Sequence, residues 1–129
     1  MAVAEGKYFT FDSETSIRTD FLETFPYEGE PQFIVYETRE FSCVCPYSGL
    51  PDYGKLIIEH QPDKVCVELK SFKYYLTSFR NVGIYQEPVT NRIFQDIYAA
   101  LKPTYLKVTT IYNTRGGIDA TCSIEKGKR

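Results

Sequence analysis

The pattern of hydrophobic and polar residues changes twice along the chain, from strand-like to helical and back. Residues 32–44 are rich in β-branched and aromatic side chains, which predicts a strand with a bulge near Thr38-Arg39. Residues 53–60 have the same character and predict the returning strand, and residues 61–64 make the next turn. A hairpin-like pair of strands is therefore expected, with residues 45–52 as its connection.

A helical period begins after residues 65–67. The apolar residues at helical spacing are Leu69, Phe72, Leu76 and Phe79, and residues 81–83 end this helix. A second helix is predicted to open at Glu87-Pro88, because proline is tolerated in a first turn, and to stop at Pro103. Its apolar stripe repeats in steps of four residues: Val89, Ile93, Ile97 and Leu101.

Two further β-rich runs, 104–113 and 118–124, surround a glycine-containing hairpin connection. The order is strand, strand, helix, helix, strand, strand, which predicts an α+β fold with a sheet. Residues 1–30 mix polar and aromatic residues with turn formers, and we expect a lead-in segment that packs over a single domain spanning 1–129.

The composition limits the class of partner. The chain has 129 residues, 43% of them hydrophobic, which fits one domain with a real core. A formal net charge of -2 favours neither nucleic acid nor an anionic membrane, so a small-molecule ligand is expected. No apolar stretch approaches the roughly 18 residues of a membrane-spanning helix, and the start lacks the apolar core of a signal peptide. A cytoplasmic location is therefore expected.

Four cysteines are present: Cys43, Cys45, Cys66 and Cys122. A mid-sized intracellular domain with an adequate core needs no disulfide, so free thiols are expected. Zinc held by three of these cysteines and the single histidine, His60, is an alternative. The C-x-C spacing of the first two lacks the separation of common structural zinc sites, and His60 has no spaced partner.

The loop 45–52 (CPYSGLPD) contains the most plausible nucleophile and proton donor of the chain. Cys45 closes an apolar run and is followed at once by proline, which places the thiol at the end of a strand. An anionic Asp52 would disfavour a neighbouring thiolate, so its more useful role is that of an acid. On this loop alone, a structural cysteine beside a turn aspartate is the simpler interpretation.

Residues 68–75 (ELKSFKYY) match, position for position, a signature of the QueF nitrile reductases. The loop CPYSGLPD resembles the cysteine-to-aspartate loop of that family. The segments SFRN (78–81) and TRGGI (114–118) resemble two further family motifs. Together these matches extend from about residue 40 to about residue 120, nearly the whole chain.

The resemblance implies the tunnelling fold, in which a four-stranded antiparallel sheet carries two antiparallel helices and subunits assemble into a barrel. It also implies reduction of 7-cyano-7-deazaguanine to 7-aminomethyl-7-deazaguanine with two NADPH, in the pathway to the tRNA base queuosine. The family assembly is a homo-oligomer of two stacked pentamers. Unpaired edges at strands 32–44 and 118–124 agree with an oligomer.

The resemblance also implies the roles of individual residues. Cys45 would form a covalent thioimide with the nitrile while Asp52 protonates its nitrogen. The cofactor would be bound by Lys70, Ser71, Lys73 and Arg115. From spacing alone, a solvated basic helix face is the simpler interpretation of the lysines.

The resemblance also implies which residues bind the base of the substrate: Val67, Glu68, Leu69, Gln86 and Glu87. A carboxylate can accept two hydrogen bonds from a guanine-like edge, and Glu87 is the better candidate. Its simpler interpretation is an acidic residue that stabilises a helix N-terminus. Gln86 differs from the histidine of other family members, and an amide does not titrate.

Two alternatives remain open for the function. A QueF-like amidinotransferase shares the thioimide-forming cysteine but lacks the cofactor signature that this chain has at 68–75. A non-catalytic purine- or pterin-binding module on the same fold would need Glu87 and not Cys45. The two interpretations differ in whether the thiol reacts with the nitrile.

Overall fold

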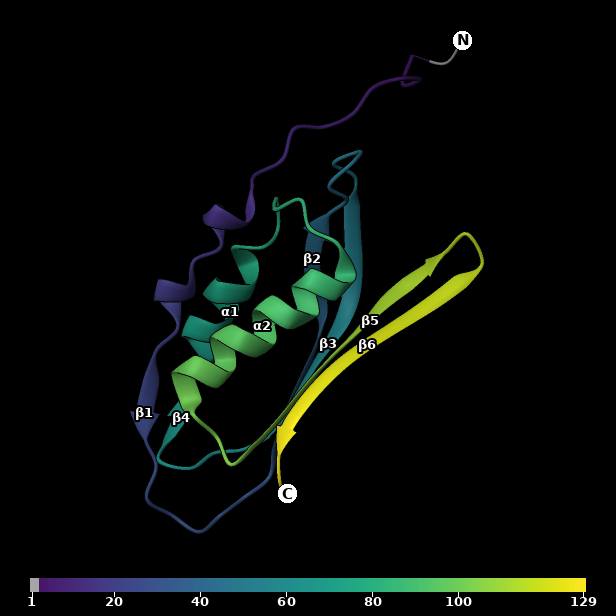
Figure 1. Cartoon of the computed structure of the whole chain (residues 1–129). Coiled ribbons are helices and arrows are strands. Elements are labelled where there is room, and N and C mark those ends of the chain that lie inside the picture. The colour runs from purple at the N-terminus through teal and green to yellow at the C-terminus, as the bar shows by residue number, and fades with distance from the viewer. Residues whose placement is uncertain (1–2) are drawn as a thin grey trace.

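A four-stranded antiparallel sheet forms the framework of the computed structural model, which describes residues 3–129 (Figure 1). Its strands in spatial order are β2 (Ile34–Val44), β3 (Pro51–Gln61), β5 (Tyr105–Arg115) and β6 (Ile118–Gly127). All neighbours are antiparallel, and β2 and β6 are the edges, as predicted. The fold is therefore α+β, with the expected order of the long elements.

The predicted bulge in β2 is present, since the register with β3 shifts between Thr38 and Phe41. The extra residue changes which side chains face the helices: Tyr36 points inward before the bulge, whereas Phe41 and Cys43 are buried after it. Continuing this alternation brings Cys45 to the helix-covered side of the sheet.

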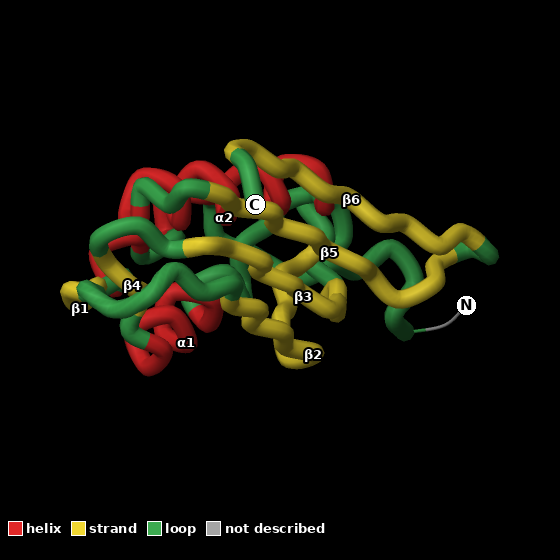
Figure 2. Tube along the Cα trace, turned by 90° about the horizontal axis from the view of Figure 1, so that it is seen from below, coloured by secondary structure: helices red, strands yellow, loops and turns green. Residues whose placement is uncertain are grey.

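Both helices, α1 (Leu69–Thr77) and α2 (Gln86–Leu101), lie on one face of the sheet (Figures 1 and 2). Helix α1 is shorter than its apolar stripe, because Phe79 follows in the next turn, where it is fully buried. Helix α2 begins one residue before the predicted Glu87 and ends at Leu101. Its C-cap, Lys102, adopts a left-handed conformation with φ 45° ahead of Pro103. The core lies between these helices and the sheet.

The first 30 residues contain more structure than the sequence indicated. Two short 3-10 turns, η1 (Glu14–Ser16) and η2 (Thr19–Phe21), precede a strand, β1 (Thr24–Pro26). Strand β1 pairs antiparallel with β4 (Val65–Val67), the segment that leads into α1. Because this second sheet is made from segments about 40 positions apart, local sequence patterns did not reveal it.

The other face of the main sheet carries no helix. Along β3, the alternate residues from Asp52 to His60 are buried, while those between them are partly or fully exposed. The β5–β6 ribbon extends away from the helices and ends in a turn at Gly116-Gly117, whose φ angles of 59° and 77° fit a type I′ hairpin (Figure 1). Within residues 3–129, no helix is long and apolar enough to cross a membrane.

His60 is fully buried at the end of β3 opposite to the cysteine loop. Neither ring nitrogen has a hydrogen-bond partner, and its ring centroid lies 5.3 Å from that of Tyr36. Burial lowers the pKa of His60 below its ordinary value of 6.5, and the nearby backbone of Ile58 opposes this shift only in part. The native protein therefore holds this imidazole in its neutral form.

We expect His60 to make the protein less stable as the pH falls. The unfolded chain takes up a proton near pH 6.5 and the native chain does not, so stability is present above that pH and is lost below it. The loss is at most about 1.4 kcal/mol per pH unit. Urea unfolding at pH 7.0 and 5.5 should show a smaller pH dependence for His60→Leu than for the wild type. Equal pH dependence of the two proteins would contradict the assignment.

Candidate active site

The backbone of Val44 brings the cysteine loop and helix α2 together. The N–H of Val44 donates to the carbonyl oxygen of Val82 at 3.0 Å, and its own carbonyl accepts from the N–H of Ile84 at 3.2 Å. This parallel bridge joins the end of β2 to the loop between the helices. Since α2 begins two residues after Ile84, its first turn lies beside Cys45.

A cavity of about 270 Å³ opens at this junction. The residues with relevant chemistry that line it are Cys45, Asp52, Gln86, Glu87, Tyr112 and Arg115. They come from the ends of β2, β3 and β5 and from the first turn of α2. The structure therefore brings together five of the residues that the sequence assigned to the site, Tyr112 being the addition.

The surroundings of Cys45 favour its thiolate. The backbone N–H of Ser48 lowers the pKa of Cys45 below its ordinary value, and the Ser48 hydroxyl adds to the effect, against a smaller opposing effect of burial. The loop is tight: the N–H of Gly49 donates to the Cys45 carbonyl oxygen at 2.9 Å, and Gly49 has a φ of 73°. The charge of Asp52 raises the pKa of Cys45 slightly, as expected from the sequence.

Asp52 is the buried carboxylate of the cavity and Arg115 is its ionic partner. The two groups approach to 2.8 Å between Nη1 of Arg115 and Oδ1 of Asp52. Only 8% of the Asp52 side chain is exposed, against 57% of the Arg115 side chain. The guanidinium therefore covers the carboxylate from the solvent side of the cavity.

The two polar residues at the start of α2 differ in how much of their hydrogen-bonding capacity is used. The amide nitrogen of Gln86 donates to the carbonyl oxygens of Thr110 and Ala120, each at 3.1 Å, and so ties α2 to β5 and β6. Its amide oxygen remains available as an acceptor. The carboxylate of Glu87, in contrast, is exposed and has no hydrogen-bond or ion-pair partner among residues 3–129.

Tyr112 lines the cavity and contacts the buried thiol of Cys43. The Tyr112 hydroxyl lies 3.2 Å from the Cys43 sulfur, and either group can be the donor. Burial raises the pKa of Cys43 to about 11, and burial also raises the pKa of Tyr112. Both groups are therefore neutral near pH 7, and Cys45 is the more reactive thiol of the pair.

The remaining predicted site residues lie near the other end of the sheet. Glu68 is the N-cap of α1, because its carboxylate accepts from the N–H groups of Lys70 and Ser71, each at 2.8 Å. These bonds lower the pKa of Glu68. Ser71 is buried, and its hydroxyl donates to the Glu68 carbonyl at 2.6 Å. Val67 is buried as well, and Leu69 is about half exposed.

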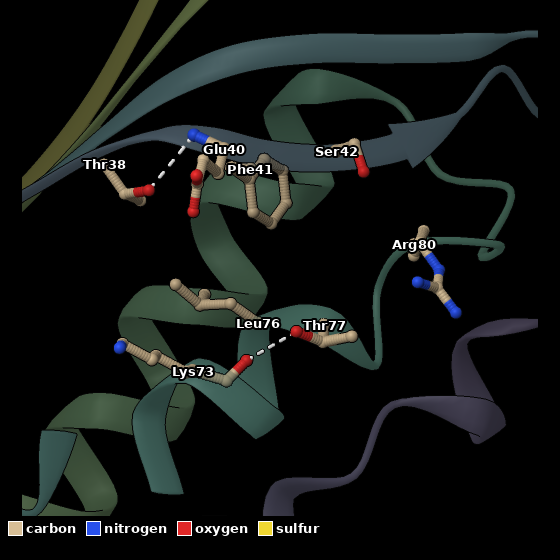
Figure 3. A pocket seen from close by; sticks show the side chains of 8 residues that line it. All are labelled: Thr38, Glu40, Phe41, Ser42, Lys73, Leu76, Thr77 and Arg80. Atoms are coloured by element: carbon tan, nitrogen blue, oxygen red, sulfur yellow. Dashed lines mark hydrogen bonds between the residues drawn. The ribbon is translucent and has the colours of Figure 1, made fainter. Parts of the chain in front are cut away.

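A second cavity, of about 290 Å³, lies between the bulge of β2 and helix α1 (Figure 3). Lys73 and Arg80 lie at its two ends, and Thr38 and Ser42 offer hydroxyl groups between them (Figure 3). Neither cation forms an ion pair with a carboxylate of the described chain. This cavity does not contain Cys45 or Asp52, so one chain has two separate groups of predicted site residues.

The zinc alternative receives no geometric support. His60 lies at the opposite end of β3 from Cys45, and Cys66 lies on β4. Across residues 3–129, no group of three or more histidine, cysteine or acidic side chains is arranged to hold a metal ion. All four cysteines are free thiols.

Three residues in or beside these cavities were missed by the sequence analysis: Ser48, Tyr112 and Arg80. Ser48 appeared only as a turn former, although its position three residues after a strand-end cysteine could have indicated a donor to the thiolate. Tyr112 reads as an ordinary strand aromatic. Arg80 was part of a matched motif but received no role.

The fold and cavity define an α+β protein whose site combines a cysteine of lowered pKa with a carboxylate, the arrangement of an enzyme that uses a nucleophilic thiol. Comparison with known proteins gives the family. The model described as QueF-like protein matches residues 51–129. The crystal structure of an archaeosine synthase QueF-Like in the apo form has a TM-score of 0.71 and 26% identity, covering 78% of this chain and 99% of that chain.

Relatives named NADPH-dependent 7-cyano-7-deazaguanine reductase are more similar in sequence. Those of Thermotoga petrophila and Thermotoga maritima are each 56% identical over 123 residues, which cover 94% of this chain and 89% of the relative. That of Caldicellulosiruptor bescii is 51% identical over 104 residues, 79% of each chain. The chain belongs to the QueF-like family, which confirms the family indicated by the sequence motifs.

We expect Ser48→Ala to raise the pKa of Cys45, because the hydroxyl that assists the thiolate is removed while the backbone N–H remains. Loss of one such hydrogen bond corresponds to roughly a 2- to 10-fold slower alkylation at pH 7. The measurement is the rate of iodoacetamide labelling of Cys45 as a function of pH, followed by mass spectrometry. Ser123→Ala, on β6, is the control and should label like the wild type.

Proposed function

We propose that the protein reduces the nitrile of 7-cyano-7-deazaguanine to the aminomethyl group of 7-aminomethyl-7-deazaguanine, with two NADPH, in queuosine biosynthesis. The observation that supports this most directly is that Cys45, Asp52 and Glu87 line one cavity. The relatives with 56% identity are named for this reaction. The alternative, a QueF-like amidinotransferase, is less well supported, since the archaeosine synthase QueF-Like structure is only 26% identical to this chain.

Cys45 starts the reaction as a nucleophile. Its sulfur adds to the nitrile carbon, the triple bond becomes a double bond, and the nitrogen takes up a proton, which gives a covalent thioimide. The lowered pKa of Cys45 supports this role, because the thiolate is the reactive form. After the first reduction the carbon–sulfur bond breaks, Cys45 leaves as a thiolate, and the imine remains in the cavity for the second reduction.

Asp52 supplies the proton that the nitrile nitrogen needs. Its carboxyl group lies in the same cavity as the thiol and is almost completely buried, so a proton it carries is directed to the substrate and not to water. Tyr112 forms the wall behind both groups. Asp52 in this role is a catalytic residue, whereas Ser48 acts through Cys45.

The base fits the cavity by size and by donor set. A volume of about 270 Å³ lies just below the roughly 300–1,000 Å³ of pockets for drug-sized ligands, so it suits one bicyclic base and not a dinucleotide. The unpaired Glu87 carboxylate can accept two hydrogen bonds from the guanine-like edge. The free amide oxygen of Gln86 offers a further acceptor.

The residues proposed for NADPH fit an anionic dinucleotide. Bound NADPH supplies one hydride to the substrate carbon in each of the two reductions. Lys70 and Lys73 are exposed on α1, and neither is paired with a carboxylate of the described chain. Arg115 is the third cation. Ser71 is buried with its hydroxyl engaged, so its contribution is to support the start of α1, where Glu68 is the N-cap.

A homo-oligomer with sites between subunits accounts for the separation of the two residue groups. One chain places Cys45 and Asp52 in one cavity and Lys73 in another. Both edge strands, β2 and β6, have backbone groups that no strand of the same chain pairs, and the face of the sheet away from the helices is uncovered. Closure of such sheets into the barrel of a tunnelling fold, with two stacked pentamers, would join the α1 residues of one subunit to the Cys45 cavity of the next.

Incubation with 7-cyano-7-deazaguanine in the absence of NADPH is expected to give a protein adduct on Cys45 whose mass equals protein plus intact nitrile. Cys45→Ala should give none, and Cys43→Ala should still react, because the pKa of Cys43 is raised by burial. With NADPH present, two NADPH should be consumed per nitrile. An adduct on Cys43, or a ratio other than two, would contradict the proposal.

Mixed oligomers test whether two chains complete each site. We expect Cys45→Ala and Lys73→Ala, each nearly inactive alone, to recover activity when co-assembled in equal amounts. Random mixing places both intact groups at about one quarter of the interfaces. Cys45→Ala mixed with Asp52→Asn is the matched control, because both residues line one cavity of one chain, and it should recover nothing. No recovery in the first mixture would mean that one chain supplies the whole site.

A further inference from the structure

Arg115 is paired with Asp52 in the free chain. Its Nη1 lies 2.8 Å from Oδ1 of Asp52. The same cavity is lined by a second carboxylate, Glu87, but only Asp52 lies within ion-pair distance. If Arg115 also binds a phosphate group of NADPH, as in the function proposed above, the two contacts compete for one guanidinium.

The strand that carries Arg115 is not paired with β3 at this point. Strand β5 pairs with β3 only from Tyr105 to Tyr112, so residues 113–118 have no partner on β3. The register with β6 also shifts between Tyr112 and Arg115. The tip of the β5–β6 ribbon is therefore connected to β3 by the Arg115–Asp52 ion pair and by no strand pairing (Figure 1).

The ion pair is easily exchanged from the side of Arg115. More than half of this side chain is exposed, and exposed ion pairs contribute little to stability. A phosphate offers the guanidinium a bidentate partner with more negative charge than a carboxylate. Asp52 is buried and stays in place when Arg115 leaves.

The exchange has a consequence for the chemistry at Asp52. While Arg115 occupies Oδ1, this carboxylate accepts from the guanidinium and is not positioned to give a proton to a nitrile nitrogen. Without Arg115 on Oδ1, the carboxyl group of Asp52 is free to interact with a substrate in the cavity that it lines together with Cys45. Thioimide formation is balanced without cofactor. The Cys45 thiol gives its proton to the Asp52 carboxylate that Arg115 has left, the sulfur adds to the nitrile carbon, and Asp52 passes that proton to the nitrile nitrogen.

We propose that Arg115 is a positioning residue that couples the two ligands: it covers Asp52 in the free protein and moves to the 2′-phosphate of the cofactor, which exposes the acid to the nitrile. The inference rests on the proposed function. With the cofactor site occupied, Asp52 is exposed and addition of Cys45 is faster. Coupling between two ligands is reciprocal in binding, so the nitrile in turn strengthens cofactor binding.

The test measures the rate of adduct formation on Cys45 by mass spectrometry with NADP⁺, which carries the 2′-phosphate and donates no hydride. We expect NADP⁺ to accelerate adduct formation of the full-length protein roughly 5-fold or more. Adenosine 2′,5′-bisphosphate should act like NADP⁺. NAD⁺, which lacks the 2′-phosphate, should have little effect.

In Arg115→Ala, adduct formation should be fast without any cofactor and should not respond to NADP⁺, while NADP⁺ binding, measured by calorimetry, weakens about 10-fold or more. Arg115→Lys should retain part of the response. Lys107→Ala, which removes a cation from the same strand outside the cavity, is the control and should respond like the wild type. Thermal unfolding of each variant verifies that it is folded.

Two outcomes would overturn the inference: slower adduct formation in Arg115→Ala without cofactor, or acceleration by NADP⁺ that persists in that variant. Either result would make Arg115 a structural partner of Asp52. Absence of a Cys45 adduct in every protein, the wild type included, would instead contradict the proposed function itself.

Discussion

The bridge between Val44 and the loop at 82–84 is the constraint on which the rest of the site depends. Through it, the end of an edge strand and the start of α2 share backbone hydrogen bonds, although about 40 residues separate them along the chain. The amide of Gln86 extends the connection to β5 and β6. Four elements therefore meet at one point, and the cavity is the space left between their ends.

Two groups in the cavity, the thiolate of Cys45 and the carboxylate of Asp52, would repel each other, and the surrounding residues compensate for this repulsion. A thiolate and a carboxylate at close range are both destabilised, and each has its own compensating partner here. Ser48 lowers the pKa of Cys45 from within the loop, whereas Arg115 pairs with Asp52 from the ribbon. The first partner lies within the loop and the second is a largely exposed side chain of another element, so the Asp52 ion pair is the one within reach of a ligand.

One chain places the predicted site residues in two separate groups. Glu68 is the N-cap of α1 and Lys73 lines the cavity at the bulge of β2, whereas Cys45 follows the end of β2 and lines the other cavity. In the oligomer proposed above, the two free edges and the uncovered face of the sheet are the surfaces through which a second copy would join the two groups. The helix cap also fixes the backbone of Lys70 and Ser71 before any ligand binds.

The sequence by itself determined the long elements, their order, the edge strands and the family. Periodicity and turn chemistry act over a few residues, and motifs such as residues 45–52 and 68–75 keep their spacing within one element. The β1–β4 pair, the role of Ser48 and the contact of Arg115 with Asp52 were decided only by tertiary structure. The bulge in β2 shows the physical reason. Its position could be predicted from the sequence, because turn and strand preferences are local. The direction in which it turns Cys45 depends on the pairing of β2 with β3, and this pairing joins residues that no local pattern connects.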